Sequence, residues 1–447
     1  MVSLTKGQEI ESLDSDGLSM VTHRKLFFRL IPIIFLCLIF NQLDKINVAF
    51  AKLQMAHDIG LSPAAYGFGA GIFFIGYCAF EIPSNIMLYR TGARYWISRI
   101  LVSWGIISAC MMFVDSGTTF DVLRLLLGIA EAGFAPGLIL YISEWFPVRT
   151  RGRMIAAFMI AIPVSGIIGA PVSTFVMTAV PSGLSLHGWQ WMFLLEGIPV
   201  IVLGVLFWFY MPDRIDDANW LDTKEKAALK VAIGEVSQDS RHSSGFIHGL
   251  VNRRVWMLCL IYFLLVAALY GVSFWLPTIV QDLGVKNIRR IGLIVAIPFF
   301  MAAIAMPLLS ANADRTGRNK THLALTAIVG ALGLILSVLL EASGVLSFIA
   351  LAIGAAAIFA FLPLFWTLPT MLLRGKSAAT GFALITCIGN LGGFFAPYLM
   401  GAVTSAFGSV RFGVVGLAAC AILSALCIAC LPRKSSDPKI LDKQNYS

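Results

Sequence analysis

The chain has 447 residues, of which 58% are hydrophobic and 13% charged, and its formal net charge is +9. A soluble protein of this length would need more polar surface to cover its core, so the composition excludes an ordinary soluble enzyme. The basic residues recur in short breaks between apolar stretches and do not gather in one patch, which argues against a nucleic acid partner. The lipid bilayer is therefore the expected environment of most of the chain.

Residues 1–25 are expected to form a cytoplasmic tail. The first part of this segment, Met1–Met20, is polar and acidic, and it has neither the apolar core nor the cleavage site of a signal peptide. The first apolar stretch is therefore predicted to be a membrane span that stays in the protein.

Apolar stretches of about 20 residues recur along the rest of the chain, and each is long enough to cross a bilayer as a helix. They occupy residues 26–51, 66–88, 95–114, 120–142, 153–179, 191–211, 255–280, 290–311, 321–341, 345–370, 378–402 and 410–431. We therefore predict an all-α membrane protein with twelve transmembrane helices, because helices satisfy their own backbone hydrogen bonds in lipid.

A long polar stretch divides these spans into two sets of six. It defines an N-terminal bundle (26–211), a cytoplasmic linker (212–252), a C-terminal bundle (253–432) and a polar tail (433–447). Basic residues fall in alternate breaks between spans, so the positive-inside rule predicts that both termini and the linker are cytoplasmic. One break, with Lys286, Arg289 and Arg290, lies on the predicted external side and does not fit the rule.

The two bundles repeat each other in sequence. Gly317, in Asp-Arg-Thr-Gly-Arg, follows Gly92, in Tyr-Arg-Thr-Gly-Ala-Arg, by 225 positions, and the Arg-Gly pair ending at Gly375 follows that ending at Gly152 by 223. Two independent pairs at nearly one spacing predict two pseudo-symmetric six-helix halves. Secondary transporters are built in this way, with a binding site between the halves near the midplane of the bilayer.

Two predicted helices carry both an acid and a base. Asp44 and Lys45 lie in the first span, and Arg124 and Glu131 lie in the fourth. A charge at the middle of a membrane helix costs roughly 2.5–3.5 kcal/mol on insertion scales, so these residues are expected to have a use. They predict a membrane protein that handles charged solutes or protons.

On the first helix, Asn41, Asp44, Lys45 and Val48 are spaced to share one face. In one interpretation this face lines a polar cavity, where Lys45 meets a substrate carboxylate and Asp44 binds a proton. In the other, the two charges neutralise each other or partners on nearby helices.

On the fourth helix, Asp121, Arg124, Gly128 and Glu131 also share a face. Gly128 leaves room for a solute or for a neighbouring helix. Burial disfavours the ionised form of a carboxyl group and a nearby cation favours it, so Glu131 is a candidate proton carrier. The alternative is a static pair of Arg124 and Glu131 that holds this helix to the first.

Neutral residues are candidates to complete the site. Tyr77 lies in the second span, Trp366 in the tenth and Asn390 in the eleventh, and each can also serve packing or a hydrogen bond between helices. Glu196 is expected to cap the start of a helix near the external interface. All eight cysteines lie in apolar spans and are expected to act as small hydrophobic residues.

Several segments resemble a known family. The loop at 314–318 resembles the hallmark loop of the major facilitator superfamily. Four more segments resemble its anion:cation symporter branch, whose members include tartrate, galactonate, phthalate and 4-hydroxyphenylacetate permeases: Leu43–Ala51, Glu81–Asn85, Gly188–Gly197 and Ile388–Gly393. The resemblance covers nearly the whole chain outside the two tails.

The resemblance implies roles for individual residues. The acids matching Asp44 and Glu131 carry protons, and the base matching Arg124 links them to the substrate. The family usually has Arg where this chain has Lys45, which keeps the charge and loses the two-pronged geometry that matches a carboxylate.

Together these observations predict a proton-coupled symporter that imports a small organic anion by alternating access. The expected solute is a hydroxy-dicarboxylate, a sugar acid or an aromatic carboxylate, bound by Lys45, Tyr77, Arg124, Trp366 and Asn390. Cytoplasmic charges, including Asp314, Arg315, Arg318 and Glu144, are expected to form gating salt bridges between the halves. The expected location is the inner (plasma) membrane, with the monomer as the working unit.

The chief alternative is efflux by antiport with protons, which the same charges would serve. A membrane-embedded enzyme is a weaker alternative, because no nucleophile with a base, no carboxylate pair and no metal cluster is evident at membrane depth. No cofactor, metal ion or catalytic residue is therefore expected.

Overall fold

The computed structural model describes residues 19–180, 186–233, 252–373 and 376–431, and the regular elements in these ranges are helices. The predicted tail 433–447, most of the predicted tail 1–25 and part of the predicted linker lie outside the described residues. The first helix begins at Met20, where the Oγ atom of Ser19 accepts a hydrogen bond from the backbone amide of Thr22 at 3.1 Å. Residues 20–25 of the predicted tail therefore belong to this helix.

The described chain contains twelve spans that are long and apolar enough to cross a membrane, as predicted. The first six are formed by α1 (Met20–Asp58), α2 (Pro63–Thr91), α3 (Ala93–Cys110) with η1 (Met111–Phe113), α4 (Gly117–Glu131) with α5 (Phe134–Trp145), α6 (Val148–Ala179) and α7 (Gly188–Tyr210). The short elements η2 (Ile215–Asp217) and α8 (Thr223–Ile233) follow. The last six are formed by α10 (Arg253–Asp282), α11 (Ile288–Thr316), α12 (Asn319–Leu339), α13 (Gly344–Phe359) with α14 (Phe361–Leu372), α15 (Lys376–Asn390) with α16 (Gly392–Phe407), and α17 (Arg411–Cys430).

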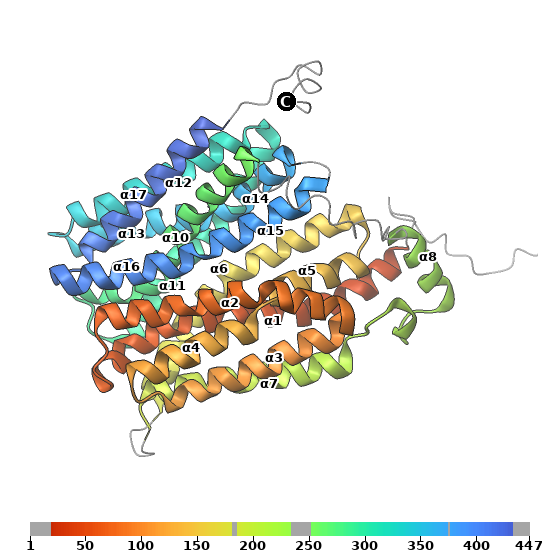
Figure 1. The fold of residues 1–447 in the computed structure, drawn as a ribbon, viewed down its shortest axis with the longest axis horizontal. Helices are drawn as coiled ribbons and strands as arrows, with labels where there is room; N and C mark the ends of the chain where they lie inside the picture. Colours follow the sequence, from red (N-terminus) through yellow and green to blue (C-terminus); the bar gives the residue numbers. More distant parts are fainter. Residues whose placement is uncertain (1–18, 181–185, 234–251, 374–375, 432–447) are drawn as a thin grey trace, which may run out of the picture.

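The helices form two bundles that lie side by side (Figure 1). In the N-terminal half, α3 packs on α7, α2 on α4 and α1 on α6, and in the C-terminal half α12 packs on α13 and α17. The halves meet where α2 packs on α16, α6 on α11 and α1 on α10. Large side chains such as Phe209, Leu339 and Val345 are more than 70% exposed on the outside of the bundles, as expected for surfaces in contact with lipid.

The repeated loop predicted from sequence has the same backbone role in both halves. Gly92 ends α2 with φ of 89°, and Gly317 ends α11 with φ of 65°. A residue with positive φ after a helix releases the chain from the helix axis, and glycine adopts this conformation without steric cost. The sequence repeat therefore marks equivalent turns after the second and eighth spans.

Most described hydrogen bonds between the halves involve residues near one end of the helices, which we name the closed end, and α8 lies at the opposite end of the molecule (Figure 1). Here Tyr66 donates to the carbonyl of Phe274 at 3.0 Å, and Arg289 donates to the hydroxyl of Thr178 at 2.6 Å. Arg289, one of the three basic residues that did not fit the predicted orientation, thus joins α11 to α6. A Cβ atom on Gly67 of α2 would lie 2.3 Å from the carbonyl oxygen of Pro397, so the close approach of α2 and α16 requires glycine there.

The fourth span, predicted as one helix over 120–142, is broken between α4 and α5 at residues 132–133. Gly133 adopts φ of 83°, which ends α4 directly after Glu131. The carbonyl of Ala132, freed by the break, accepts a hydrogen bond from the hydroxyl of Ser84 on α2 at 2.6 Å. A broken helix in the membrane requires such partners. The tenth and eleventh spans are also broken, at Ala360 and at Leu391.

Candidate functional site

The buried charges of α1 and α4 form a direct ion pair. The Nζ atom of Lys45 lies 2.5 Å from the Oε1 atom of Glu131, and Asn41 donates to the same oxygen at 2.7 Å. Lys45 also donates to the Oδ1 atom of Asn41 at 2.9 Å, and the exposure of these three residues is 6% or less. The other carboxylate oxygen of Glu131 is buried without a hydrogen-bond partner among the described residues, so it can still accept a hydrogen bond.

Asp44 turns away from Lys45 and into the N-terminal bundle. It accepts hydrogen bonds from Trp104 at 2.9 Å and from Ser108, both on α3, and from Asn47 at 3.4 Å. Consecutive residues on an α-helix project about 100° apart, because a turn contains 3.6 residues. Asp44 and Lys45 therefore do not line one face and do not neutralise each other. The other part of that interpretation, that the charges meet partners on nearby helices, is confirmed for Lys45 by its ion pair with Glu131.

Arg124 is 1% exposed and lies in no ion pair within the described part of the chain. One guanidinium nitrogen donates to the carbonyl of Ala70 at 3.1 Å, and the guanidinium carbon lies 5.0 Å from the ring centre of Phe73. Its Nε atom is buried and has no hydrogen-bond partner among the residues that the structure describes. The predicted static pair of Arg124 and Glu131 is not formed, because Glu131 is taken by Lys45.

The small size of Gly128 on α4 makes room for a neighbouring helix, α2, and not for a solute. A Cβ atom at this position would lie 2.0 Å from the carbonyl oxygen of Phe73 on α2. The tight contact of α2 with α4 also brings Tyr77 to the ion pair. The Nζ atom of Lys45 lies 5.6 Å from the centre of the Tyr77 ring, and Tyr77 is 7% exposed.

The predicted site residues of the C-terminal half gather around Tyr262 of α10. The Trp366 ring lies 5.1 Å from that of Tyr262 and stacks on Phe382 at 6.0 Å. Asn390 is the last residue of α15, directly before the break, and a Cβ atom on its neighbour Gly389 would touch the Tyr262 ring. The Asn390 side chain is partly exposed and has no hydrogen bond to the described residues. No described contact joins Trp366 or Asn390 to the charged residues of α1 and α4.

Glu196 does not cap a helix, and that prediction is wrong. The helix α7 begins eight residues earlier, where His187 is the capping residue and its backbone amide donates to the side-chain oxygen of Gln190 at 2.7 Å. Glu196 is 5% exposed and accepts hydrogen bonds from Ser173 of α6 at 2.7 Å and Asn47 of α1 at 3.0 Å. Sequence reasoning missed Asn47 and Glu196 as a pair, although both lie in the segments that resemble the symporter branch.

The predicted gating residues lie at the end opposite the closed end. Asp314, Arg315 and Arg318 are exposed near the end of α11, and Glu144 is exposed on α5. Among the side chains that the structure describes, these four residues form no ion pair with one another or with a neighbour. Salt bridges between the halves therefore stay a prediction for a conformation in which this end is shut.

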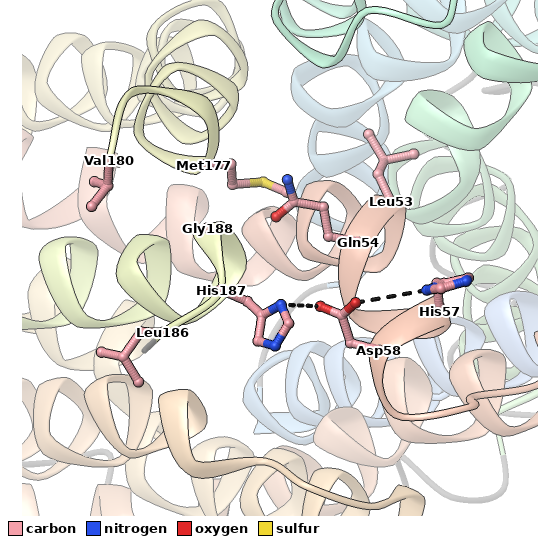
Figure 2. Close-up of a pocket in the computed structure, with 9 residues that line it drawn as sticks. All are labelled: Leu53, Gln54, His57, Asp58, Met177, Val180, Leu186, His187 and Gly188. Atoms are coloured by element: carbon pink, nitrogen blue, oxygen red, sulfur yellow. Dashed lines mark ion pairs between the residues drawn. The ribbon is translucent and has the colours of Figure 1, made fainter. Parts of the chain in front are cut away.

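A pocket of about 670 Å³ lies at the surface of the closed end, between the end of α1 and the start of α7, and Figure 2 shows the residues that line it. Asp58 accepts a hydrogen bond from Trp189 at 2.8 Å and lies 3.0 Å from a ring nitrogen of His187, with the exposed His57 at 3.8 Å. Asp58 is 13 residues after Lys45 on the same helix, which corresponds to about 20 Å at 1.5 Å per residue. This pocket is thus separate from the buried charged cluster.

A sequence model described as Major Facilitator Superfamily matches residues 34–397, which span both helical bundles. The chain belongs to the Major Facilitator Superfamily. The D-xylose–proton symporter, a solved structure, shares this fold with a TM-score of 0.72 over 92% of this chain and 99% of its own, at 16% identity. Members of this superfamily are transporters, so the protein is a multi-pass membrane transporter and not an enzyme.

Relatives within the superfamily cover nearly the whole chain. A protein of Pseudomonas putida, named as a presumed metabolite transport protein NicT, is 43% identical over 94% of this chain and 97% of its own. An Agrobacterium vitis protein, named as a presumed tartrate transporter, is 42% identical over 94% of this chain and 92% of its own. A quinolone resistance transporter of Acinetobacter baumannii is 37% identical over 88% of this chain and 90% of its own. These relatives agree with the resemblance to the anion:cation symporter branch.

Proposed function

We propose that this superfamily transporter is a proton-coupled symporter that imports a small organic anion. The observation that carries the proposal is the buried guanidinium of Arg124, which has a free Nε atom and no carboxylate partner among the described residues. A buried guanidinium with an unused donor and no ion-pair partner still has a hydrogen bond to make, so this position suits an anion that arrives from outside. The planar guanidinium matches a carboxylate with two parallel hydrogen bonds.

The Lys45–Glu131 pair supplies the coupling. While Glu131 is ionised, it holds Lys45 at 2.5 Å. A proton on Glu131 removes that negative charge and leaves Lys45 with Asn41 as its partner, so that the ammonium can meet a substrate carboxylate. The substrate and the proton thus enter together, and each favours the binding of the other.

Asp44 is the second proposed proton site. Its described partners, Trp104, Ser108 and Asn47, are neutral donors, and Arg124 lies within electrostatic range. These donors stabilise the ionised form without locking it in an ion pair, so protonation does not require a salt bridge to break.

The substrate is proposed to bind between the halves. Lys45, Tyr77 and Arg124 would face it from the N-terminal half, and Trp366 and Asn390 from the C-terminal half. Two buried cations suit a solute with two negative groups, which agrees with the tartrate named for one relative. A sugar acid or an aromatic carboxylate would use one carboxylate and its hydroxyl or ring groups at Asn390, Tyr77 and Trp366.

We propose that the protein works as a monomer in the inner membrane, with the closed end facing outward and both termini in the cytoplasm. Because hydrogen bonds join the halves at the closed end, this conformation would be the one that opens to the cytoplasm. Alternating access would shut the other end through Asp314, Arg315 and Arg318.

Uptake into proteoliposomes with a pH-sensitive dye inside tests the function. The panel is tartrate, galactonate, phthalate and 4-hydroxyphenylacetate, with wild type beside Glu131→Gln. We expect one of these anions to acidify the lumen, and we expect Glu131→Gln to abolish acidification while exchange of the anion across the membrane survives. Anion uptake by wild type with no proton movement would overturn symport, and normal coupling in Glu131→Gln would remove the role of that residue.

A second candidate function is efflux by proton antiport, which the relationship to the quinolone resistance transporter favours. The same liposomes decide between the two. Under an inward proton gradient, symport accumulates the organic anion inside, whereas antiport expels a preloaded quinolone. Quinolone expulsion without anion accumulation would replace import as the function.

A further inference from the structure

A further buried acid of the N-terminal half, Glu196, has no use in the mechanism proposed above. Glu196 accepts hydrogen bonds from Ser173 of α6 and from Asn47 of α1. Beside it, Gly197 packs against the backbone of α3 at Gly105 and Ala109. The charged group that acts on Glu196 is Asp44, which lies beyond Asn47. No cation of the described residues is within ion-pair distance of its carboxylate.

Asn47 bridges the two acids. Its Nδ2 atom lies 3.0 Å from the Oε2 atom of Glu196 and 3.4 Å from the Oδ1 atom of Asp44. Its Oδ1 atom is buried and has no hydrogen-bond donor. A buried amide oxygen without a donor costs about 1–3 kcal/mol, so this bridge is incomplete as long as both neighbouring acids are ionised.

The Nδ2 atom of Asn47 contacts both acids, and its Oδ1 atom bonds to neither. A proton on Glu196 or on Asp44 allows the amide to turn over, so that its oxygen takes the place of the nitrogen and accepts from the protonated carboxyl group. The oxygen and nitrogen of an amide have nearly the same size, so both orientations fit the same space.

The balance of buried charge also requires a proton. The half contains four buried carboxyl groups (Asp44, Glu81, Glu131 and Glu196) and two buried cations (Lys45 and Arg124). Lys45 contacts Glu131 and lies within electrostatic range of Glu81, and Arg124 lies within electrostatic range of Asp44 and Glu131. Glu196 is therefore the acid that no described cation faces. A buried negative charge without compensation is strongly unfavourable, and one bound proton removes it.

We propose that Asp44 and Glu196 form an acid pair that shares one proton across Asn47, so that the proton site assigned to Asp44 consists of two carboxyl groups. The inference rests on the proposed proton coupling for its role in transport. The sharing itself is a property of the folded protein without substrate, and it can be tested without transport.

Infrared spectroscopy of the purified protein in lipid tests the shared proton. A protonated buried carboxyl group absorbs apart from ionised carboxylates, and its band shifts when H₂O is exchanged for D₂O. We expect this band in wild type at neutral pH, its loss or shift in both Glu196→Gln and Asp44→Asn, and its retention in Glu131→Gln. An unchanged band in Glu196→Gln, or no such band in wild type, would overturn the shared proton.

Transport kinetics test the same pair by its function. In Glu196→Gln the neighbouring negative charge is gone, so Asp44 loses its proton more readily, and the pH of half-maximal uptake falls by about one unit. Asn47→Leu breaks the bridge and is expected to shift the same midpoint, with no further shift when it is combined with Glu196→Gln. Additive shifts would show that the residues act separately.

One control variant and two distinct outcomes separate the possible failures. Thr326→Ala removes a buried hydroxyl whose described hydrogen bond goes to the backbone of its own helix, α12, so its anion exchange and unfolding temperature report the effect of lost packing away from the acids. If wild type moves the anion without protons, the proposed symport fails while the infrared result still decides the acid pair. If wild type couples normally and the midpoint of Glu196→Gln is unchanged, the acid pair fails and symport stands.

Discussion

The ammonium group of Lys45 on α1 lies 2.5 Å from the carboxylate of Glu131 on α4, and both side chains are buried. The pair joins two helices that have few other polar contacts with each other, and it places a titratable group directly on a cation that a substrate can use. We therefore expect substitutions of Lys45 or Glu131 to change both the stability of the protein and its transport activity.

Lys45→Met should destabilise the protein. Removal of one partner of a buried ion pair leaves the other charge uncompensated, at a cost of about 3 kcal/mol. We expect a lower unfolding temperature in detergent for Lys45→Met, partial recovery in the double variant with Glu131→Gln, and near wild-type stability for Lys45→Arg. Equal losses in the single and double variants would show that the pair does not stabilise the fold.

Arg124→Lys should impair uptake, although it keeps the positive charge. Lys loses the planar fork that matches a carboxylate, and we expect kcat/KM for the transported anion to fall about 100-fold, which corresponds to about 2.7 kcal/mol. The matched control is Arg290→Lys at an exposed position of α11, which should transport normally. Uptake by Arg124→Lys within twofold of wild type would contradict direct binding of the substrate by Arg124.

Gly128→Ala should disturb the packing of α2 against α4. The added methyl group would lie 2.0 Å from the carbonyl oxygen of Phe73, a backbone atom that moves only if a helix moves. We expect a lower yield of folded protein by size-exclusion chromatography and an unfolding temperature several degrees below wild type. Gly416→Ala on α17 is the control, because nothing lies within 4 Å of its added methyl group, and equal behaviour of the two variants would contradict the predicted contact.

Cys78 of α2 and Cys387 of α15 offer a chemical lock between the halves. The thiol of Cys78 contacts the backbone carbonyl of Cys387 at 3.5 Å. We expect a membrane-permeant oxidant to join the two sulfurs, to stop transport, and to be reversed by a thiol reductant. Cys78→Ala should be insensitive to the oxidant and Cys420→Ala as sensitive as wild type, whereas inhibition that persists in Cys78→Ala would place the reactive thiol elsewhere.

Lys52→Gln should loosen the closed end. The Nζ atom of Lys52 on α1 lies 3.5 Å from the ring centre of Trp275 on α10 and donates to Thr278 at 3.0 Å. A desolvated contact between a cation and an aromatic ring is worth up to about 2 kcal/mol, so its loss favours conformations in which the halves part at this end. We expect slower oxidative cross-linking of Cys78 with Cys387 in Lys52→Gln than in wild type. Faster or equal cross-linking would show that Lys52 does not hold the halves together.

The amino-acid sequence by itself determined the environment, the number of spans and the two-half architecture. Membrane insertion depends on the length and polarity of continuous segments, and both are properties of the chain in one dimension. The repeated turns at Gly92 and Gly317 were visible for the same reason, because a helix end with positive φ is a local requirement. The residues Asp44, Lys45, Arg124 and Glu131 also stood out locally, as charges in apolar spans.

Only the tertiary structure decided which of these charges meet. Asn41 and Glu131 are 90 residues apart and Asn47 and Glu196 are 149 apart, and each contact depends on how two helices are rotated and packed against each other. Helical periodicity defines the faces of one helix but not the neighbour that each face receives. For this reason the sequence grouped Asp44 with Lys45, whereas packing against α3 and α4 separates them and turns Glu196 from an expected cap into a partner of the buried cluster.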